Sequence, residues 1–338
     1  MSGNEIGHDM DYDLRLDEIC DIISENKHKT VLIQFPEGLK NLACDVKDRL
    51  EEKTQANVII SADPCYGACD QPLATGQLGI DLIVQFGHAK IPNLESPDAS
   101  IFIEAHSSLD VISVVKEAIN YLKGRVGLIT TVQHVHKLKD VKDFLTENGI
   151  AAVIGEGSNR LAHDGQVLGC DLSSATSISS EVDSFLFVGS GNFHAIGVAI
   201  ATRKPVIVAD PYLKEVRDIE EIKNKLMRQR HGAIVKAKEA ESFGIMVGTK
   251  SGQSRLKLAY DLKMLAEEHG KKGYIFTMNE FTPMNLKAFE IDAYVSTACP
   301  RIAIDDHRMY HVPILTPMEF EIALGEVDWE DYRFDELL

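Results

Sequence analysis

The feature that most constrains the fold of this chain is the recurrence of short apolar runs, rich in β-branched residues, with helical patterns between them. Apolar runs that lack polar alternation are typical of parallel strands buried on both faces of a sheet, joined by crossover helices. The sequence therefore predicts an α/β protein. The expected strands cover residues 30–35, 57–61, 82–87, 100–104, 124–131, 151–155, 184–189, 205–209, 243–248, 273–278, 293–297 and 312–316.

The expected strands form three groups of four along the 338 residues, which indicates three domains of similar architecture. Helical patterns lie between the strands: Leu16, Ile19 and Ile23, for example, share one helix face. Because the pattern is interrupted near residues 106 and 212, we predict domains at 1–106, 107–212 and 213–338. Each is expected to be a four-stranded, mainly parallel sheet flanked by helices. An acidic tail is expected to end the third domain and to pack onto a neighbouring domain or subunit.

Charge and hydropathy exclude several classes of partner. The 35 Lys and Arg against 52 Asp and Glu give a net charge of −17, which repels polyanions, so we expect no direct nucleic-acid contact. No stretch approaches the ~20 apolar residues of a membrane span, and the N-terminus lacks the apolar core of a secretion signal. We expect no membrane contact and a cytoplasmic protein, whose six cysteines serve packing, metal binding or redox chemistry.

Position along the chain divides these cysteines into two groups. Cys20 and Cys44 lie within expected helices, where a free cysteine behaves as a small apolar side chain, so we expect both to pack. The other cysteines lie in loops that follow strands, where ligands of open α/β sheets bind. They are Cys65, Cys69, Cys170 and Cys299.

Each third of the chain contributes one such cysteine loop, and the three loops can meet where three domains join. Cys69 and Cys170 are 101 residues apart and Cys170 and Cys299 are 129 apart, whereas zinc fingers and ribbons take their ligands in local pairs. Three thiolates suit a 4Fe-4S cluster with one iron free of protein ligands. The spacing leaves two interpretations open: one shared cluster, or separate cysteines that are buried and inert.

Six short segments carry a resemblance to a known family. They are residues 64–70 (PCYGACD), 86–92 (FGHAKIP), 166–170 (QVLGC), 189–194 (GSGNFH), 248–253 (GTKSGQ) and 298–305 (ACPRIAID). In residue type and order they resemble motifs of the 2-(3-amino-3-carboxypropyl)histidine synthases, the iron-sulfur enzymes of diphthamide biosynthesis. The resemblance extends over nearly the whole chain.

The resemblance implies three similar α/β domains around a central 4Fe-4S cluster, with one cysteine ligand from each domain. The implied ligands are Cys69, Cys170 and Cys299, and the Tyr-Gly-Ala-Cys part of the first motif favours Cys69 over Cys65. A homodimer is also implied, as is a separate electron donor.

The implied reaction transfers a 3-amino-3-carboxypropyl group from S-adenosylmethionine to a histidine of translation elongation factor 2, the first step of diphthamide biosynthesis. It proceeds by reductive radical cleavage of the Cγ–S bond. The sequence lacks the Cys-x3-Cys-x2-Cys signature of enzymes that cleave a different bond of S-adenosylmethionine, which agrees with this implication.

Further residues in the motifs are candidates for contacts to S-adenosylmethionine. A glycine loop lets backbone amides approach a ligand closely, although an ordinary tight turn has the same pattern. Arg301 can hold the carboxylate of the cofactor or, alternatively, serve as a helix cap or form an interdomain ion pair. His88, His134 and His136 are assigned no role. The candidates are Gly189, Gly191, Phe193, His194, Ser251, Gln253 and Arg301.

Two rival functions remain open. A quinolinate synthase-like enzyme also has three α/β domains around a cluster held by three cysteines, but it does not use S-adenosylmethionine. A non-enzymatic α/β binding protein would carry its cysteines incidentally. The motifs around Cys69 and Cys299 favour the diphthamide family over quinolinate synthase, and an iron-sulfur absorption band would exclude the binding protein.

Overall fold

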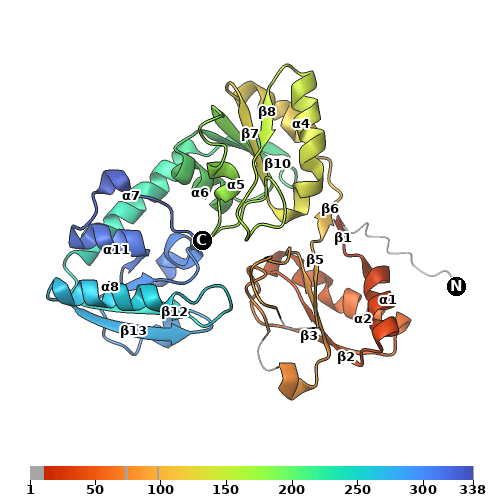
Figure 1. The fold of residues 1–338 in the computed structure, drawn as a ribbon, viewed down its shortest axis with the longest axis horizontal. Coiled ribbons are helices and arrows are strands. Elements are labelled where there is room, and N and C mark those ends of the chain that lie inside the picture. Colours follow the sequence, from red (N-terminus) through yellow and green to blue (C-terminus); the bar gives the residue numbers. More distant parts are fainter. Residues whose placement is uncertain (1–10, 73–74, 97–98, 338) are drawn as a thin grey trace.

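Three separate, mainly parallel sheets organise the chain, each flanked by helices (Figure 1). The computed structural model describes residues 11–72, 75–96 and 99–337, so the predicted domain ends at residues 1 and 338 lie outside the described residues. Three α/β units of similar architecture confirm the predicted fold class. We call them the first, second and third domains in chain order.

The first domain is built on a parallel sheet of strand order β3-β2-β4-β5. Helices α1 and α2 cover it because each carries one apolar face: Ile19 and Ile23 of α1 and Val46 and Leu50 of α2 pack in one core with Ile33 of β2. The elements are α1 (Leu16–Asn26), β2 (Thr30–Gln34), the 3-10 helix η1 (Glu37–Leu42), α2 (Ala43–Lys53), β3 (Asn57–Ile60), η2 (Thr75–Leu78), β4 (Leu82–Phe86) and β5 (Ser100–Ile103).

A two-stranded antiparallel sheet lies at the junction of the first two domains. In it β1 (Tyr12–Asp13) pairs with β6 (His106–Ser107), so the chain segment just before α1 is tied to the segment that enters the second domain. Tyr12 stacks on Tyr212 of the second domain, with ring centroids 6.2 Å apart. This junction coincides with the boundary expected near residue 106.

The second domain contains a five-stranded sheet of order β11-β10-β9-β7-β8, in which β11 alone is antiparallel. The expected four strands are present, but the boundary expected near residue 212 is wrong, because β11 lies beyond it. The sequence EVRD of β11 has no apolar run, and Asp210 forms the preceding turn by accepting the N–H groups of Tyr212 and Leu213. The elements are α3 (Ile112–Ala118), η3 (Ile119–Tyr121), β7 (Val126–Thr130), η4 (Val132–Lys137), α4 (Leu138–Glu147), β8 (Ala152–Ile154), α5 (Ser173–Thr176), β9 (Ser184–Val188), α6 (Phe193–Thr202), β10 (Val206–Asp210) and β11 (Glu215–Asp218).

The third domain has a parallel sheet of order β13-β12-β14-β15, with the fully buried β12 at its centre. Its longest helix is the charged α7, and none of the described helices has the length and apolarity needed to cross a bilayer. The elements are α7 (Glu220–Ala237), β12 (Ser242–Gly248), α8 (Leu256–Glu268), β13 (Lys272–Met278), α9 (Pro283–Leu286), β14 (Ala293–Ser296), α10 (Arg301–Ile304), η5 (Asp306–Met309), β15 (Ile314–Leu315), α11 (Pro317–Leu324) and η6 (Trp329–Asp331).

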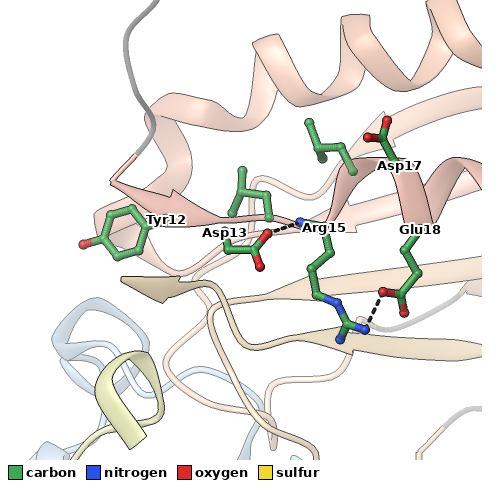
Figure 2. Close-up of a pocket in the computed structure, with 7 residues that line it drawn as sticks. Tyr12, Asp13, Arg15, Asp17 and Glu18 are labelled. Atoms are coloured by element: carbon green, nitrogen blue, oxygen red, sulfur yellow. Dashed lines mark hydrogen bonds and ion pairs between the residues drawn. The ribbon is translucent and has the colours of Figure 1, made fainter. Parts of the chain in front are cut away.

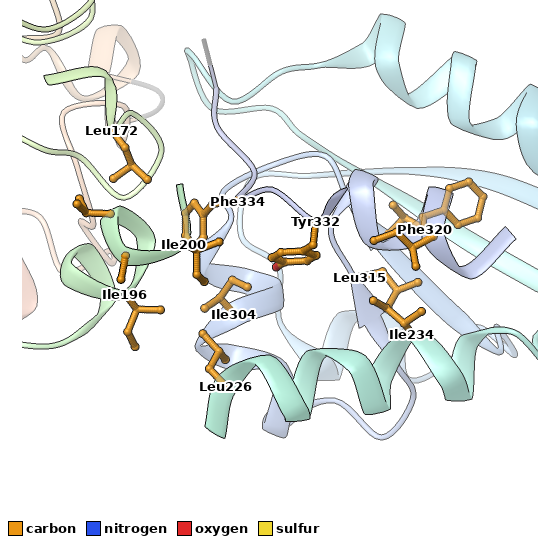
Figure 3. Packing of buried hydrophobic residues seen from close by; sticks show 14 of the residues in the cluster. Leu172, Ile196, Ile200, Leu226, Ile234, Ile304, Leu315, Phe320, Tyr332 and Phe334 are labelled. Carbon is orange, nitrogen blue, oxygen red and sulfur yellow. The ribbon is translucent and has the colours of Figure 1, made fainter. Parts of the chain in front are cut away.

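One hydrophobic core runs through the second and third domains, whereas the first domain has a core of its own. Ile196 and Ile200 of α6 lie in the same cluster as Leu226 of α7 and Phe320 of α11 (Figure 3). The acidic tail takes part, since its buried Tyr332 and Phe334 belong to this cluster. The tail thus packs onto a neighbouring domain, as expected.

The two helical cysteines differ in environment. Cys20 is buried on the apolar face of α1, as predicted. The prediction that Cys44 packs is wrong, because Cys44 is exposed. Ala43, Val46 and Leu50 supply the buried face of α2, and Cys44 lies outside that stripe.

Candidate metal centre

Three cysteine loops, one from each domain, meet at a single cavity of about 310 Å³. Cys69 lies in the loop after β3, Cys170 in the loop between β8 and α5, and Cys299 between β14 and α10. All three side chains line this cavity. The fold therefore brings together thiols that are more than 100 residues apart in sequence.

Most of the remaining surface of the cavity wall is apolar, although polar side chains also line it. Such a wall excludes water and strengthens the electrostatic interactions of any charged group within it. The apolar side chains include Pro36, Ile91, Val132, Val167, Leu168 and Leu337.

The environments of Cys65 and Cys69 decide which of them can act as a ligand in the first loop. Cys65 is 1% exposed, its Sγ lies 3.5 Å from Nε2 of Gln85 and 3.8 Å from Nδ1 of His88, and it is absent from the described cavity wall. Cys69 lines the cavity, and its Sγ accepts a hydrogen bond of 3.1 Å from Nε2 of Gln253. The geometry supports Cys69 as the ligand.

The protonation chemistry of the three thiols suits a cationic partner. Burial raises the pKa of the Cys69 thiol to about 12, and the neighbouring Asp70 carboxylate acts in the same direction. Burial also raises the pKa of Cys170, against the opposing charge of Arg160, and raises that of Cys299, to which the nearby Cys170 adds. The thiols thus stay protonated at neutral pH until a metal group displaces their protons.

The donor set fits an iron-sulfur cluster better than a single metal ion. Within the described ranges, no three His, Cys, Asp or Glu side chains are placed to hold one ion together. In a 4Fe-4S cluster each thiolate binds a different iron, so the sulfurs need to surround a volume and not to meet at a point. Three thiols around one cavity meet that requirement, and Cys69, Cys170 and Cys299 would hold the cluster.

Four of the predicted cofactor-contact residues lie on the cavity wall: Phe193, His194, Gln253 and Arg301. Gly169, just before Cys170, allows the Phe193 ring to approach, because a Cβ there would lie 2.3 Å from Cε1 of that ring. The sequence motif around Cys170 therefore serves local packing.

The other three candidates, Gly189, Gly191 and Ser251, do not belong to the described wall. The amide of Gly189 is occupied, since it donates to the carbonyl of Ala209, and the carbonyl of Gly191 accepts from Arg217. Gly191 has a φ of 77°, which a glycine adopts without strain. In this structure the glycine loop connects β9 to α6 and is hydrogen-bonded to the end of β10. Its predicted role in cofactor binding stays a prediction.

The histidines fall into two groups. Burial lowers the pKa of both His88 and His194 to about 4, so both are neutral imidazoles on the cavity wall. His134 and His136 belong elsewhere: His134 packs edge-on against Tyr212, and His136 stacks on His106 with centroids 4.4 Å apart.

Charged side chains join the first and third domains beside the Cys69 loop. Lys250 forms ion pairs with the buried Asp70 and with Glu280. The guanidinium of Arg301 lies 4.2 Å from the centroid of the Tyr66 ring, and Arg301 also pairs with Asp306 at 3.2 Å. Arg301 therefore makes interdomain contact and lines the cavity at once.

Sequence reasoning missed several wall residues. Gln133 lines the cavity and joins two domains, because its Nε2 donates to the carbonyl of Gly87 at 2.7 Å. Leu337 reaches the cavity from the far end of the chain. No motif marks either residue. Gln166 begins the segment that ends in Cys170 and could have been chosen from that position.

A second hollow, at the start of α1, has none of this chemistry (Figure 2). Its polar groups bond to one another: Oδ1 of Asp13 accepts a hydrogen bond from the N–H of Arg15 at 3.0 Å, and the Arg15 guanidinium forms an ion pair with Glu18. The cysteine-lined cavity is therefore the candidate site.

Comparisons with known proteins agree with this choice. The profile of the diphthamide synthesis protein family matches residues 35–333. The 2-(3-amino-3-carboxypropyl)histidine synthase of Pyrococcus horikoshii is 40% identical over 316 residues, which cover 92% of this chain and 89% of that protein. Subunit 1 of the Caenorhabditis elegans enzyme of that name is 32% identical, covering 90% and 78%.

Solved structures lead to the same family. The crystal structure of Dph2 from Pyrococcus horikoshii with a 4Fe-4S cluster matches with a TM-score of 0.88 and 36% identity, covering 96% of this chain and 94% of that one. Fold, motifs and sequence identity thus agree over nearly the full length. The chain belongs to the family of diphthamide synthesis proteins, as its motifs predicted.

Proposed function

We propose that this chain is a 2-(3-amino-3-carboxypropyl)histidine synthase, a transferase that moves the 3-amino-3-carboxypropyl group of S-adenosylmethionine to a histidine of translation elongation factor 2. The observation that carries the proposal is the meeting of Cys69, Cys170 and Cys299 at one cavity. The names of its relatives support this function over a quinolinate synthase or a binding protein.

The three thiolates would hold a 4Fe-4S cluster and leave one iron without a protein ligand. When bound and reduced, such a cluster supplies the electron that breaks the Cγ–S bond of the sulfonium. Gln253 donates a hydrogen bond to Sγ of Cys69 and so stabilises the negative charge on that sulfur. The apolar wall keeps water away from the reactive carbon fragment.

Other wall residues would orient the co-substrate. The guanidinium of Arg301 can bind the carboxylate of the aminocarboxypropyl group with two parallel hydrogen bonds. His88 and His194 present neutral imidazoles, which bind through hydrogen bonds and not through charge. Correct orientation of Cγ toward the open iron selects the bond that breaks.

The test is anaerobic incubation of the reduced protein with labelled S-adenosylmethionine and elongation factor 2. We expect methylthioadenosine as the nucleoside product and label on one histidine of the factor. Deoxyadenosine as the main product would contradict cleavage of the Cγ–S bond, and transfer without any bound iron would contradict the role of the three cysteines.

The partners belong to the same proposal. We propose that the acceptor is a folded protein, that two copies of the chain associate, and that a separate donor reduces the cluster. Half-exposed apolar side chains on α8 and β13, Tyr260, Met264 and Tyr274, offer surface for association. A mass of about twice that of the chain, measured by light scattering, supports the dimer. A monomer that modifies a short histidine peptide efficiently contradicts both the dimer and the folded protein acceptor.

A further inference from the structure

The C-terminal residues 335–337 lie between two of the three cysteine loops, beyond residue 333 where the match to the family profile ends. They follow Phe334, whose ring packs edge-on against Phe193 of the cavity wall with centroids 5.9 Å apart. Leu337 lines the cavity itself. Residues 334–337 therefore belong to the surroundings of the site.

On one side this segment binds the Cys170 loop through the backbone. The N–H of Leu337 donates to the carbonyl of Cys170 at 2.8 Å, and the N–H of Leu172 donates to Oε1 of Glu336 at 2.7 Å. These two hydrogen bonds, one at Cys170 and one at Leu172, tie this end of the Cys170 loop to the tail.

On the other side the segment reaches the Cys299 loop through Arg255. The guanidinium binds both carboxylate oxygens of Asp335, at 3.0 and 2.6 Å, and its Nη1 donates to the carbonyl of Glu336 at 3.3 Å. The same guanidinium donates through Nε to the carbonyl of Thr297 at 2.6 Å and lies 3.4 Å from the carbonyl of Ala298, the residue before Cys299. Arg255 and Asp335 are both largely buried, so solvent screens the pair only weakly.

We propose that residues 335–337 form a strap that fixes the Cys170 and Cys299 loops relative to each other, with Arg255 and Asp335 as its positioning residues. The inference rests on the proposed function in assigning the two cysteines to a cluster. The contacts themselves bridge two domains at the two loops that carry these ligands. Loss of the strap should therefore loosen two ligand loops and leave the loop of Cys69 unchanged.

The first measurement is amide hydrogen exchange of the cluster-free full chain. In Asp335→Ala we expect faster exchange at residues 165–172 and 297–300, with no change at 64–70. A chain ending at Glu336 keeps the Arg255–Asp335 pair but lacks the Leu337 amide, so only residues 165–172 should exchange faster. Asp335→Glu, which keeps the charge, should restore most of the protection, and Asp17→Asn, which removes an exposed ion-pair partner of Lys53, is the matched control.

The second measurement uses the reconstituted protein. We expect a chelator to remove iron about 10-fold faster from Asp335→Ala than from the unchanged chain, the scale typical of residues that orient metal ligands. The electron paramagnetic resonance spectrum of the reduced protein should shift as well, which a purely global loss of stability would not cause.

The outcomes separate the strap from the proposed function. If the unchanged chain binds no iron, the cluster assignment fails, yet exchange still decides whether the strap couples the loops. Unchanged exchange in both loops overturns the strap. If Asp335→Ala also causes fast exchange in β9 and α7, the variant has exposed the shared core and the chain ending at Glu336 becomes the deciding test. In that case, residues 165–172 that stay as protected as in the unchanged chain contradict the proposal.

Discussion

The first domain and the joined second and third domains are held to the cavity by different kinds of contact. The second and third domains share one apolar core, which continues from α6 through α7 to α11 and the C-terminal residues (Figure 3). The first domain has its own core and meets the others through separate local contacts. These include the Lys250–Asp70 ion pair, the Gln253–Cys69 and Gln133–Gly87 hydrogen bonds and the Tyr12–Tyr212 stack.

This difference indicates which part of the site is fixed and which can move. Apolar burial over a continuous core is cooperative, so the loops of Cys170 and Cys299 are expected to move as one body. Each hydrogen bond or ion pair between domains contributes only about 0.5–3 kcal/mol, and its loss affects the contact locally. Of the three cysteine loops, the Cys69 loop is therefore the one whose position depends most on the interdomain contacts.

The largest expected effect comes from removing a ligand on either side of this boundary. Ala replacement of Cys69, Cys170 or Cys299 should each remove most of the bound iron and reduce transfer more than the ~100-fold that changes around metal ligands cause. Iron analysis and a transfer assay measure both effects. Cys65→Ala is the control from the same loop, and loss of the cluster in this variant but not in Cys69→Ala would reverse the assignment.

The next effect tests the shared core. Arg230 of α7 and Glu319 of α11 form an ion pair in which both side chains are 0% exposed, and Arg230 also donates to the carbonyls of Ala303 and Ile314. Arg230→Ala leaves a buried carboxylate without its cation, so we expect a loss of about 3–5 kcal/mol in the free energy of unfolding. Chemical denaturation measures it. The control is Lys53→Ala in the exposed pair with Asp17 of the first domain, where a comparable loss would contradict the contrast between the regions.

A smaller effect should follow from breaking the polar boundary itself. Lys250→Ala removes the cation from Asp70, which is 3% exposed, and we expect a cost of about 1–3 kcal/mol. The change should appear locally, as faster proteolysis or amide exchange at residues 61–72, with α7 and α11 unaffected. Lys271→Ala, which removes the partner of Glu241 in the same domain, is the matched control. Equal loosening of all three domains would show that the boundary is not the weaker contact.

The smallest effect concerns pH at a second contact between the first two domains. His163 bonds to Oε1 of Glu104 at 2.6 Å, which raises the pKa of His163 despite burial, and Asp164 acts in the same direction. Burial raises the pKa of Glu104, but hydrogen bonds from His163 and His106 outweigh it, so that this pKa lies below its usual value.

The two shifts define a pH window. A raised histidine pKa stabilises the fold below the unfolded pKa of about 6.5 and loses its effect as the pH rises through the folded value. A lowered glutamate pKa stabilises above about 4.3 and loses its effect as the pH falls. From pH ~6 to ~8.5, the free energy of unfolding of the wild type should fall by a few tenths of a kcal/mol more than that of His163→Gln. The difference is small because solvent screens the pair. Parallel stability curves for the two proteins would contradict this contact.

Local patterns in the chain predict strands well because burial of β-branched runs leaves a clear signature. Every expected strand overlaps one in the structure, from β2 to β15. The antiparallel β11 escaped prediction because three of its four residues are charged and its pairing is set by the turn at Asp210. Cys44 was misplaced for a related reason: the pattern identifies a helix, but only the packing of α2 shows which side of it faces solvent.

The sequence by itself determined the fold class, the family and the three loops that carry the cysteines, because these depend on local composition and on motifs that are continuous in the chain. The tertiary structure alone decided that Cys44 faces solvent, that the Gly189 amide is occupied in the sheet, and that Leu337 reaches the site. Such properties depend on contacts between segments far apart in sequence. Arg255 shows this most clearly: no local pattern marks it, yet it joins Asp335 to the carbonyls before Cys299.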